Sequence, residues 1–268
     1  IHFNVCNHMP MSSLIYNNLF FLSGLPRSGS TLLGTLLNQN PLIYTTHTSS
    51  FVEILYRNYS IWNEKNFAED FIGNKMKDMK IPYLKEITKA YFNQQTDKSI
   101  IIDKRRHWHM IANIKMYKEI FNKDPKIICP VRNIEEIVAS YKNICIKNKK
   151  QFPKSLEGNR FDVPFFHLKD TWNSEFKKCL LFVEYNDLIK ATQKTLNKIY
   201  DFIEQPYYKH DLNNIVSNDP LQEVEKIYGL KGLHNLPKTI KKSMTSTDIL
   251  DAKELKYYSL QNFWRIND

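Results

Sequence analysis

The sequence is poor in cysteine and glycine and contains no long apolar run. Its 268 residues include four cysteines, no two of which form a C-x-x-C pair, so we expect neither a disulfide framework nor a zinc site. Seven glycines and 25% charged residues give no sign of long disordered stretches. The apolar stretch at residues 14–25 is shorter than the about 20 residues of a membrane span. With no usual signal peptide, this favours a cytoplasmic protein, a removed N-terminal anchor or signal being the open alternative.

Apolar and basic residues, by contrast, are abundant. Hydrophobic residues make up 42% of the chain, enough for the core of one large domain, which we expect to span residues 11–268. We expect residues 1–10 to be an upstream or added segment, because the chain starts at Ile1 and methionines follow at positions 9 and 11. The net charge of +10 favours an anionic partner, such as a nucleotide or an acidic acceptor. There is no long basic run, so we expect no nucleic-acid partner.

Four short apolar runs predict buried strands, at residues 19–23, 99–102, 126–131 and 180–184. The runs are continuous rather than alternating, which is typical of parallel strands covered on both faces. Helical patterns lie between them. The predicted fold class is therefore α/β, a P-loop-type open, doubly wound and mostly parallel sheet flanked by helices.

Further features of the chain can be placed on this plan. Residues 50–97 should form a helical insert, and residues 207–268 a basic, loop-rich C-terminal part. Cys129 and Cys179 lie in apolar runs and should be core thiols. Asn133 precedes an apolar helix face and Glu136 follows three residues later, which predicts that Asn133 caps this helix in a capping-box-like arrangement.

The segment Gly-Leu-Pro-Arg-Ser-Gly-Ser-Thr at residues 24–31, here called the phosphate loop, follows a strand and precedes an amphipathic helix. Backbone N–H groups of residues 28–31 are expected to wrap an anion, with Gly29 allowing close approach. Ser30 stands where nucleotide triphosphatases carry a lysine, which argues against ATP or GTP hydrolysis. Arg27 supplies the positive charge instead. This arrangement suits a ligand with one 5'-phosphate and a reacting group beyond it.

A second anion site is indicated at the end of the third predicted strand. Arg132 stands at the carboxyl end of that strand, where open α/β sheets bind ligands. Ser140 lies two helical turns beyond the start of the following helix, on the same side. An arginine and a hydroxyl form a suitable pair for a second phosphate. The alternatives are that Arg132 binds a carboxylate and that Ser140 is a surface residue.

Together, these segments resemble the PAPS-dependent sulfotransferase superfamily, whose donor is 3'-phosphoadenosine 5'-phosphosulfate. Residues 26–32 resemble the family's 5'-phosphosulfate loop, and Arg132 with Ser140 resembles its 3'-phosphate site. Residues 183–188 and the helical pattern at 192–203 are similar to its Y-E-D-L strand and the helix after it. The Pro-Arg-Ser-Gly-Ser-Thr form is closer to the protein-tyrosine and bacterial branches than to the cytosolic small-molecule branch.

The resemblance implies a donor site without a metal. Its residues would be Arg27, Ser28, Gly29, Ser30, Thr31 and Leu32 for the 5'-phosphosulfate, Arg132 and Ser140 for the 3'-phosphate, and Tyr185 and Ser243 around the nucleotide. A core aromatic is the alternative for Tyr185, and a solvated loop residue for Ser243.

The resemblance also implies a role for Lys104, which would contact the transferring sulfuryl group and the leaving oxygen. Fixed cations there stabilise the negative charge that spreads over those oxygens in the transition state. Arg105 and Arg106 are the alternatives to Lys104.

The general base is open among His47, Glu53 and His107. The acceptor hydroxyl or amine is open as well: a tyrosine in an acidic peptide, a glycan hydroxyl, or a small alcohol or phenol. We expect the insert at residues 50–97 to form the acceptor wall. Two other functions compete with the sulfotransferase, namely a P-loop kinase for a nucleotide or small molecule and a non-catalytic module that binds an anionic polymer.

Overall fold

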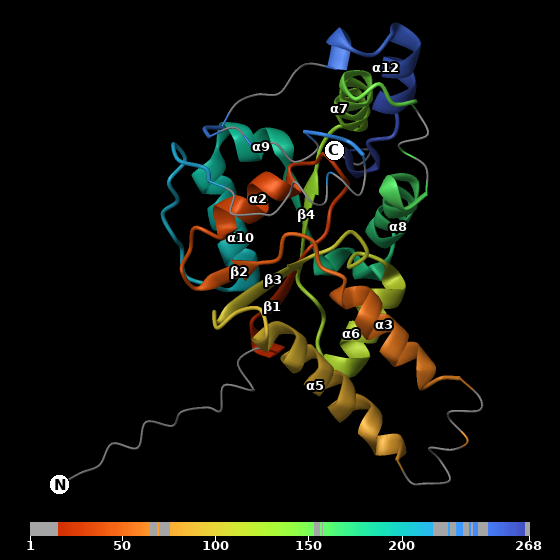
Figure 1. The fold of residues 1–268 in the computed structure, drawn as a ribbon, viewed down its shortest axis with the longest axis vertical. Coiled ribbons are helices and arrows are strands. Elements are labelled where there is room, and N and C mark those ends of the chain that lie inside the picture. The colour runs from red at the N-terminus through yellow and green to blue at the C-terminus, as the bar shows by residue number, and fades with distance from the viewer. Residues whose placement is uncertain are drawn as a thin grey trace, which may run out of the picture.

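Five parallel strands form the central sheet in the described part of this computed structural model (Figure 1). The structure describes residues 16–64, 69, 76–152, 156, 158–216, 225, 229–232, 236, 238–240 and 246–265. The strands are β1 (Leu19–Leu22), β2 (Ile43–Thr45), β3 (Ile100–Lys104), β4 (Ile127–Val131) and β5 (Leu180–Glu184). Their order is β2-β3-β1-β4-β5, and every pair is parallel. The predicted α/β fold class is confirmed.

Two details of the sheet differ from the sequence-based expectation. The short edge strand β2 was not predicted, because three residues after a proline give too little pattern to recognise. Strand β3 runs two residues beyond the predicted end, so that Lys104 is its last residue rather than the start of a loop. The extension matters for the site, because Lys104 pairs in register with Leu22 at the end of β1.

Helices cover both faces of the sheet. They are α2 (Ser30–Leu37), α3 (Phe51–Ile61), α5 (Lys80–Asn93), α6 (Ile111–Phe121), α7 (Ile134–Lys147), α8 (Asp162–Trp172), α9 (Tyr185–Lys190), α10 (Thr192–Ile203) and α12 (Ala252–Ser259). Short 3-10 turns are η1 (Lys77–Met79), η3 (Gly158–Arg160), η4 (Glu175–Cys179), η5 (Ser246–Asp248) and η6 (Phe263–Arg265). Figure 1 shows α2 and α10 on one side of the sheet and α3, α5, α6 and α8 on the other.

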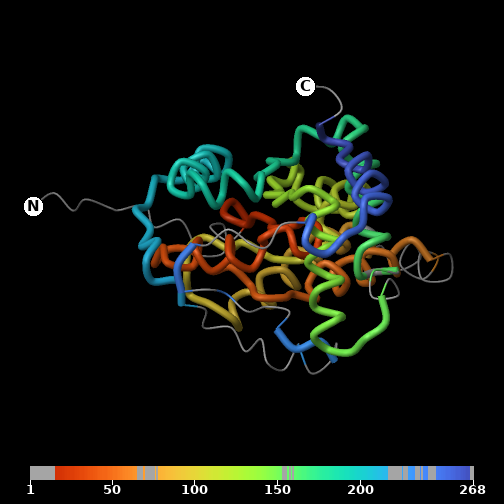
Figure 2. The backbone as a smooth tube through the Cα atoms, turned by 90° about the horizontal axis from the view of Figure 1, so that it is seen from above, coloured from red at the N-terminus to blue at the C-terminus, as the bar shows by residue number. Residues whose placement is uncertain are grey.

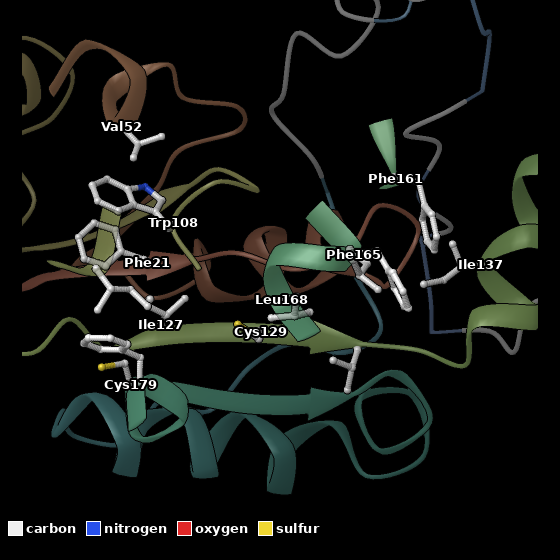
Figure 3. Close-up of a cluster of buried hydrophobic side chains, with 14 of the residues drawn as sticks. Phe21, Val52, Trp108, Ile127, Cys129, Ile137, Phe161, Phe165, Leu168 and Cys179 are labelled. Carbon is white, nitrogen blue, oxygen red and sulfur yellow. The ribbon is translucent and has the colours of Figure 1, made fainter. Parts of the chain in front are cut away.

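The larger apolar core lies between the sheet and the helices α3, α5, α6 and α8. Phe21 of β1 packs against Trp108 with ring centroids 3.9 Å apart, and Figure 3 shows Trp108 between Phe21 and Val52. Cys129 and Cys179 are buried in the same core, as the sequence predicted. The opposite face is filled by α2 and α10, whose apolar residues recur with helical spacing.

The predicted capping box at the start of α7 is wrong. Asn133 occupies the N-cap position, but its side chain forms no capping hydrogen bond with the described residues. Asn262 caps the helix instead, because its Oδ1 accepts from the N–H of Ile134 at 2.8 Å. Glu136 instead pairs with Arg132, with 2.8 Å between Nε and Oε2, because a carboxylate forms a stronger hydrogen bond with a guanidinium than with a neutral backbone N–H.

The C-terminal segment contains a helix as well as loops. A capping box of Asp251 and Glu254 starts α12, and Lys142 of α7 pairs with Glu254 at 2.7 Å. Figure 1 shows α12 beside α7, and Figure 2 shows the same blue C-terminal segment from above. After α12, the indole of Trp264 donates to Glu184 at the end of β5 at 2.9 Å. Among the described residues, no helix has the length and apolar character needed to cross a bilayer.

Candidate active site

The residues predicted to bind the donor gather at one edge of the sheet. Because all five strands are parallel, their carboxyl ends lie at the same edge. Arg27 follows β1, Lys104 ends β3, Arg132 follows β4, and Tyr185 follows β5. Four chain segments far apart in sequence therefore deliver three cations and an aromatic ring to one place.

The phosphate loop forms a tight turn into α2. The Ser28 hydroxyl donates to the carbonyl of Leu25 at 2.6 Å, and the Ser28 N–H donates to the same oxygen at 3.3 Å. Ser28 therefore holds the turn, and its N–H is not directed at a ligand as the sequence had led us to expect. The first helical hydrogen bond runs from Leu33 N to Gly29 O. The N–H groups of residues 30–32 thus stand at the open end of the helix, which attracts anions.

Gly29 is required by its geometry. Its φ is +97°, a conformation that other residues rarely adopt. A β-carbon at this position would also lie 2.8 Å from Cδ2 of Tyr185. The Tyr185 ring therefore packs directly against the phosphate loop, which supports its predicted place beside the nucleotide.

Arg27 and Arg132 concentrate positive charge beside the phosphate loop. Arg27 Nε donates to the Ser140 hydroxyl at 3.1 Å, and Arg132 Nη1 donates to the Arg27 carbonyl at 3.4 Å. Burial lowers the pKa of Arg27, and Arg132 lowers it further, yet a guanidinium stays protonated at any ordinary pH. The sequence assigned Arg27 and Ser140 to different phosphates, whereas the structure joins them in one cluster.

Arg132 is held in a fixed orientation. Its side chain is only 6% exposed. Its guanidinium carbon lies 4.3 Å from the centroid of the Tyr185 ring, and its Nε donates to Glu136 at 2.8 Å. Cation–π contact and the ion pair together restrict the side chain, which is what selective recognition of a phosphate requires. The sequence analysis missed the role of Glu136, although the spacing of four residues between Arg132 after the strand and Glu136 in the following helix was a usable signal.

Lys104 reaches the phosphate loop from the neighbouring strand. Its ammonium group donates to the Thr31 hydroxyl at 3.3 Å. Thr31 lies in the first turn of α2, so the lysine points at the helix end where the anion is expected. A lysine and a helix N-terminus thus converge where a transferring anionic group would lie.

Two of the three candidate bases are in contact. Glu53 Oε1 accepts from His107 Nδ1 at 2.7 Å and from Arg105 Nε at 2.6 Å. Burial raises the pKa of Glu53, but these bonds outweigh burial and hold the pKa below its ordinary value. A carboxylate between two donors is better suited to orienting His107 than to accepting a proton itself. His47 is half-buried in the loop between β2 and α3, where its carbonyl accepts from Thr48.

The remaining site predictions concern Leu32, Ser30 and Ser243. Leu32 is buried in the core against the sheet, so only its backbone faces the helix end. Ser30 begins α2. Ser243 lies outside the described residues. In the same C-terminal part of the chain, the Lys231 backbone forms two hydrogen bonds with the side chain of Asn148, which follows α7.

Comparison with known proteins identifies the family. The model of the sulfotransferase domain matches residues 18–247. Mouse sulfotransferase SULT7A1 complexed with PAP has a similar fold, with a TM-score of 0.52 and 15% identity over 96% of this chain and 89% of that chain. The sulfotransferase domain of the curacin biosynthetic pathway has a TM-score of 0.49 and 17% identity over 91% of this chain and 96% of its own. Because the family match covers most of the sequence, the chain belongs to the sulfotransferase domain family, as its motifs implied.

Proposed function

We propose that this chain transfers a sulfuryl group from PAPS to a hydroxyl or amine of an acceptor by in-line displacement. The observation that carries the proposal is the contact of the Lys104 ammonium group with Thr31 at the open end of α2. The cluster of Arg27, Ser140 and Arg132 lies at the same edge of the sheet. SULT7A1, the relative of similar fold, is described with PAP, the product that PAPS leaves after transfer.

The donor would be held by two groups of residues. The N–H groups of residues 30–32 and the Arg27 side chain suit the 5'-phosphosulfate. Arg132 and Ser140 suit the 3'-phosphate, which distinguishes PAPS from ATP. The buried, tethered guanidinium of Arg132 favours a dianionic phosphate over a neutral ribose hydroxyl at this position.

Lys104 and Arg27 would stabilise the transition state. When the acceptor oxygen forms its bond to sulfur, the bond from sulfur to the bridging phosphate oxygen breaks, and PAP leaves with the bonding electron pair. Lys104 neutralises charge that develops on the bridging oxygen and the sulfuryl oxygens. Removing one such fixed donor typically costs about 10²–10³ in rate.

His107 is the base that we propose for the acceptor proton. Its Nδ1–H donates to Glu53, which fixes the tautomer and leaves Nε2 as the proton acceptor. Arg105 donates to the same carboxylate oxygen, Oε1. Glu53 is in this proposal a positioning residue.

The proposal includes three classes of acceptor. A tyrosine in an acidic peptide, a glycan hydroxyl, and a small alcohol or phenol all fit the chemistry. The net charge of +10 favours an acidic acceptor. Within residues 50–97, α3 supplies Glu53 and so approaches the site, which makes this segment the proposed acceptor wall. Chimeras that exchange the segment without changing acceptor preference would contradict that assignment.

The proposal is tested by incubating the protein with PAPS and an acceptor panel of these classes and measuring PAP by chromatography. We expect turnover by wild type and by Lys194→Met, a control on the exposed face of α10, and a loss of about 10²-fold in Lys104→Met. Equal turnover by Lys104→Met, or ADP formation from ATP with magnesium in place of PAP formation, would overturn the proposal.

A further inference from the structure

A buried carboxyl group lies beside Lys104 and has no part in the chemistry described above. Asp103 precedes Lys104 in β3 and is fully buried. Successive strand residues face opposite sides of the sheet, so Asp103 faces the core of Trp108 while Lys104 faces α2. Burying a carboxyl group in an apolar core is costly unless it is hydrogen-bonded. Its partners therefore indicate why it is there.

Asp103 joins two segments that border the site. Its Oδ2 accepts from the indole N–H of Trp108 at 2.7 Å, and its Oδ1 accepts from the Thr46 hydroxyl at 3.1 Å. The Thr46 oxygen in turn accepts from the backbone N–H of Lys104 at 2.7 Å. The Lys104 N–H therefore donates to the Thr46 hydroxyl, and the Thr46 hydroxyl donates to the Asp103 carboxylate.

The loop after β2 forms hydrogen bonds with both the N–H and the carbonyl of Lys104. Thr46 accepts from its N–H, and the N–H of Ser49 donates to its carbonyl at 3.1 Å. Thr46 N also donates to Ile102 O at 3.1 Å, which continues the β2–β3 pairing by one residue beyond the strand. The end of β3 is therefore fixed by side-chain and backbone bonds together.

The same carboxylate reaches the turn that carries His107. Trp108 is the next residue in that turn, and Figure 3 shows its ring between Phe21 of β1 and Val52 of α3. Val52 precedes Glu53, the partner of His107. The pKa of Asp103 is raised to about 6, because burial raises it more than the hydrogen bonds from Ser49, Trp108 and Thr46 lower it. In this apolar core, the Asp103 carboxyl group holds its hydrogen-bond donors in place.

We propose that Thr46 and Asp103 are positioning residues for sulfuryl transfer: they fix the last residue of β3 so that the Lys104 ammonium group meets the phosphate loop at Thr31. The inference rests on the proposed function of Lys104. Neither residue touches the donor in this account. Their loss should therefore impair the chemical step while leaving nucleotide affinity nearly unchanged.

The chain offers a closely matched control. Thr45 is the neighbouring residue and is equally buried, but within the described residues its hydroxyl has no hydrogen-bond partner. Thr46→Val and Thr45→Val are the same isosteric change, and only the first removes a bond to Lys104. Thr46→Ser keeps the hydroxyl. Asp103→Asn is a second disrupting variant, because an amide cannot accept from both Thr46 and Trp108 through its two end atoms.

Three quantities are measured on each variant. They are PAP affinity by calorimetry, the rate of PAPS turnover at saturating donor, and hydrogen exchange of the peptide that contains the Lys104 amide. For Thr46→Val and Asp103→Asn we expect about tenfold slower turnover and faster amide exchange, with PAP affinity within about threefold of wild type. Thr46→Ser and Thr45→Val should match wild type in all three.

The outcomes separate this inference from the proposed function. If wild type neither binds PAP nor turns over PAPS, the proposed function is wrong. Hydrogen exchange at the Lys104 amide still tests whether Thr46 fixes the end of β3. The positioning role is overturned if Thr46→Val keeps wild-type turnover and exchange, or if Thr45→Val loses as much. It is overturned as well if Thr46→Ser fails to restore turnover.

Discussion

At the scale of single residues, Gly29 combines two constraints that can be separated by experiment. Its backbone has a positive φ, and a side chain would collide with the Tyr185 ring. Gly158 also has a positive φ, but among the described residues other than its chain neighbours no atom lies within 4 Å of where its β-carbon would be. At both positions a residue with a side chain would be strained by the positive φ, but only at Gly29 would the side chain also collide with Tyr185.

We predict that Gly29→Ala lowers PAP affinity at least about tenfold, because Tyr185 must move away from the phosphate loop. Gly158→Ala should cost about 1 kcal/mol of stability and leave PAP affinity unchanged. Calorimetry and urea unfolding measure the two effects. Equal affinity losses in both variants would contradict the role assigned to the Tyr185 contact.

Glu53 gives a prediction for the pH dependence of stability. Its pKa is lower in the folded protein, so its bonds to Arg105 and His107 stabilise the fold above its unfolded pKa and are lost as pH falls through the folded value. Glu53→Gln should therefore be less stable than wild type by roughly 1 kcal/mol at about pH 7. The difference should shrink as pH falls below the unfolded pKa of Glu53 and vanish once Glu53 is protonated in the folded protein, as measured by urea unfolding. A difference that persists in acid would show that shape rather than charge matters at Glu53.

Single-residue roles were predictable where one local motif carries them. The phosphate loop identified Arg27, and the end of an apolar run identified Arg132. The partnership of Glu53 with His107 was not predictable, because the two are 54 residues apart and meet only through packing of α3 against the turn after β3. Asp103 left a signal that was overlooked: a lone carboxylate at the end of three isoleucines.

At the scale of elements, α7 depends on a residue far away in the chain. Its first N–H group is capped by Asn262, and Glu136 within it holds Arg132. The C-terminal segment therefore supports the proposed 3'-phosphate site without contributing a ligand to it.

We predict that Asn262→Ala destabilises the protein by about 1 kcal/mol and weakens PAP binding, because the start of α7 loses its cap next to Arg132. Asn133→Ala, at the N-cap position itself, should have a smaller effect, since that side chain forms no capping bond among the described residues. Thermal unfolding and calorimetry of both variants test the assignment. A larger loss from Asn133→Ala would restore the sequence-based capping box.

Elements were predictable in proportion to their length and periodicity. The strands β1, β4 and β5 were expected within one residue of their observed bounds, because continuous apolar runs mark buried parallel strands. The edge strand β2 has three residues and depends on pairing with β3 for its existence. Such a strand has no signature of its own in the sequence.

At the scale of the whole molecule, the parallel sheet positions the residues at the ends of its strands that we propose to bind the donor nucleotide. The β1–β3 register places Lys104 beside the end of β1, and the β4–β5 pairing places Arg132 and Tyr185 together. In the proposed mechanism, these cations would take the role that magnesium has in many phosphoryl-transfer enzymes.

We predict that PAPS turnover is unchanged by a chelator such as EDTA, because in the proposed mechanism Lys104 and Arg27 supply the positive charge at the transferring group. The measurement is PAP formation with and without the chelator, and with magnesium added back. A loss restored by magnesium would favour the competing kinase-like chemistry.

The central claim is that the cluster around Arg132 recognises a 3'-phosphate. The most direct measurement is calorimetric titration of wild type, Arg132→Ala and the exposed control Arg57→Ala with PAP and with adenosine 5'-monophosphate. We predict that PAP binds more tightly than the monophosphate, and that Arg132→Ala weakens the binding of PAP alone by at least about tenfold, or about 1.4 kcal/mol. Equal affinity for the two nucleotides, or PAP binding unaffected by Arg132→Ala, would contradict it.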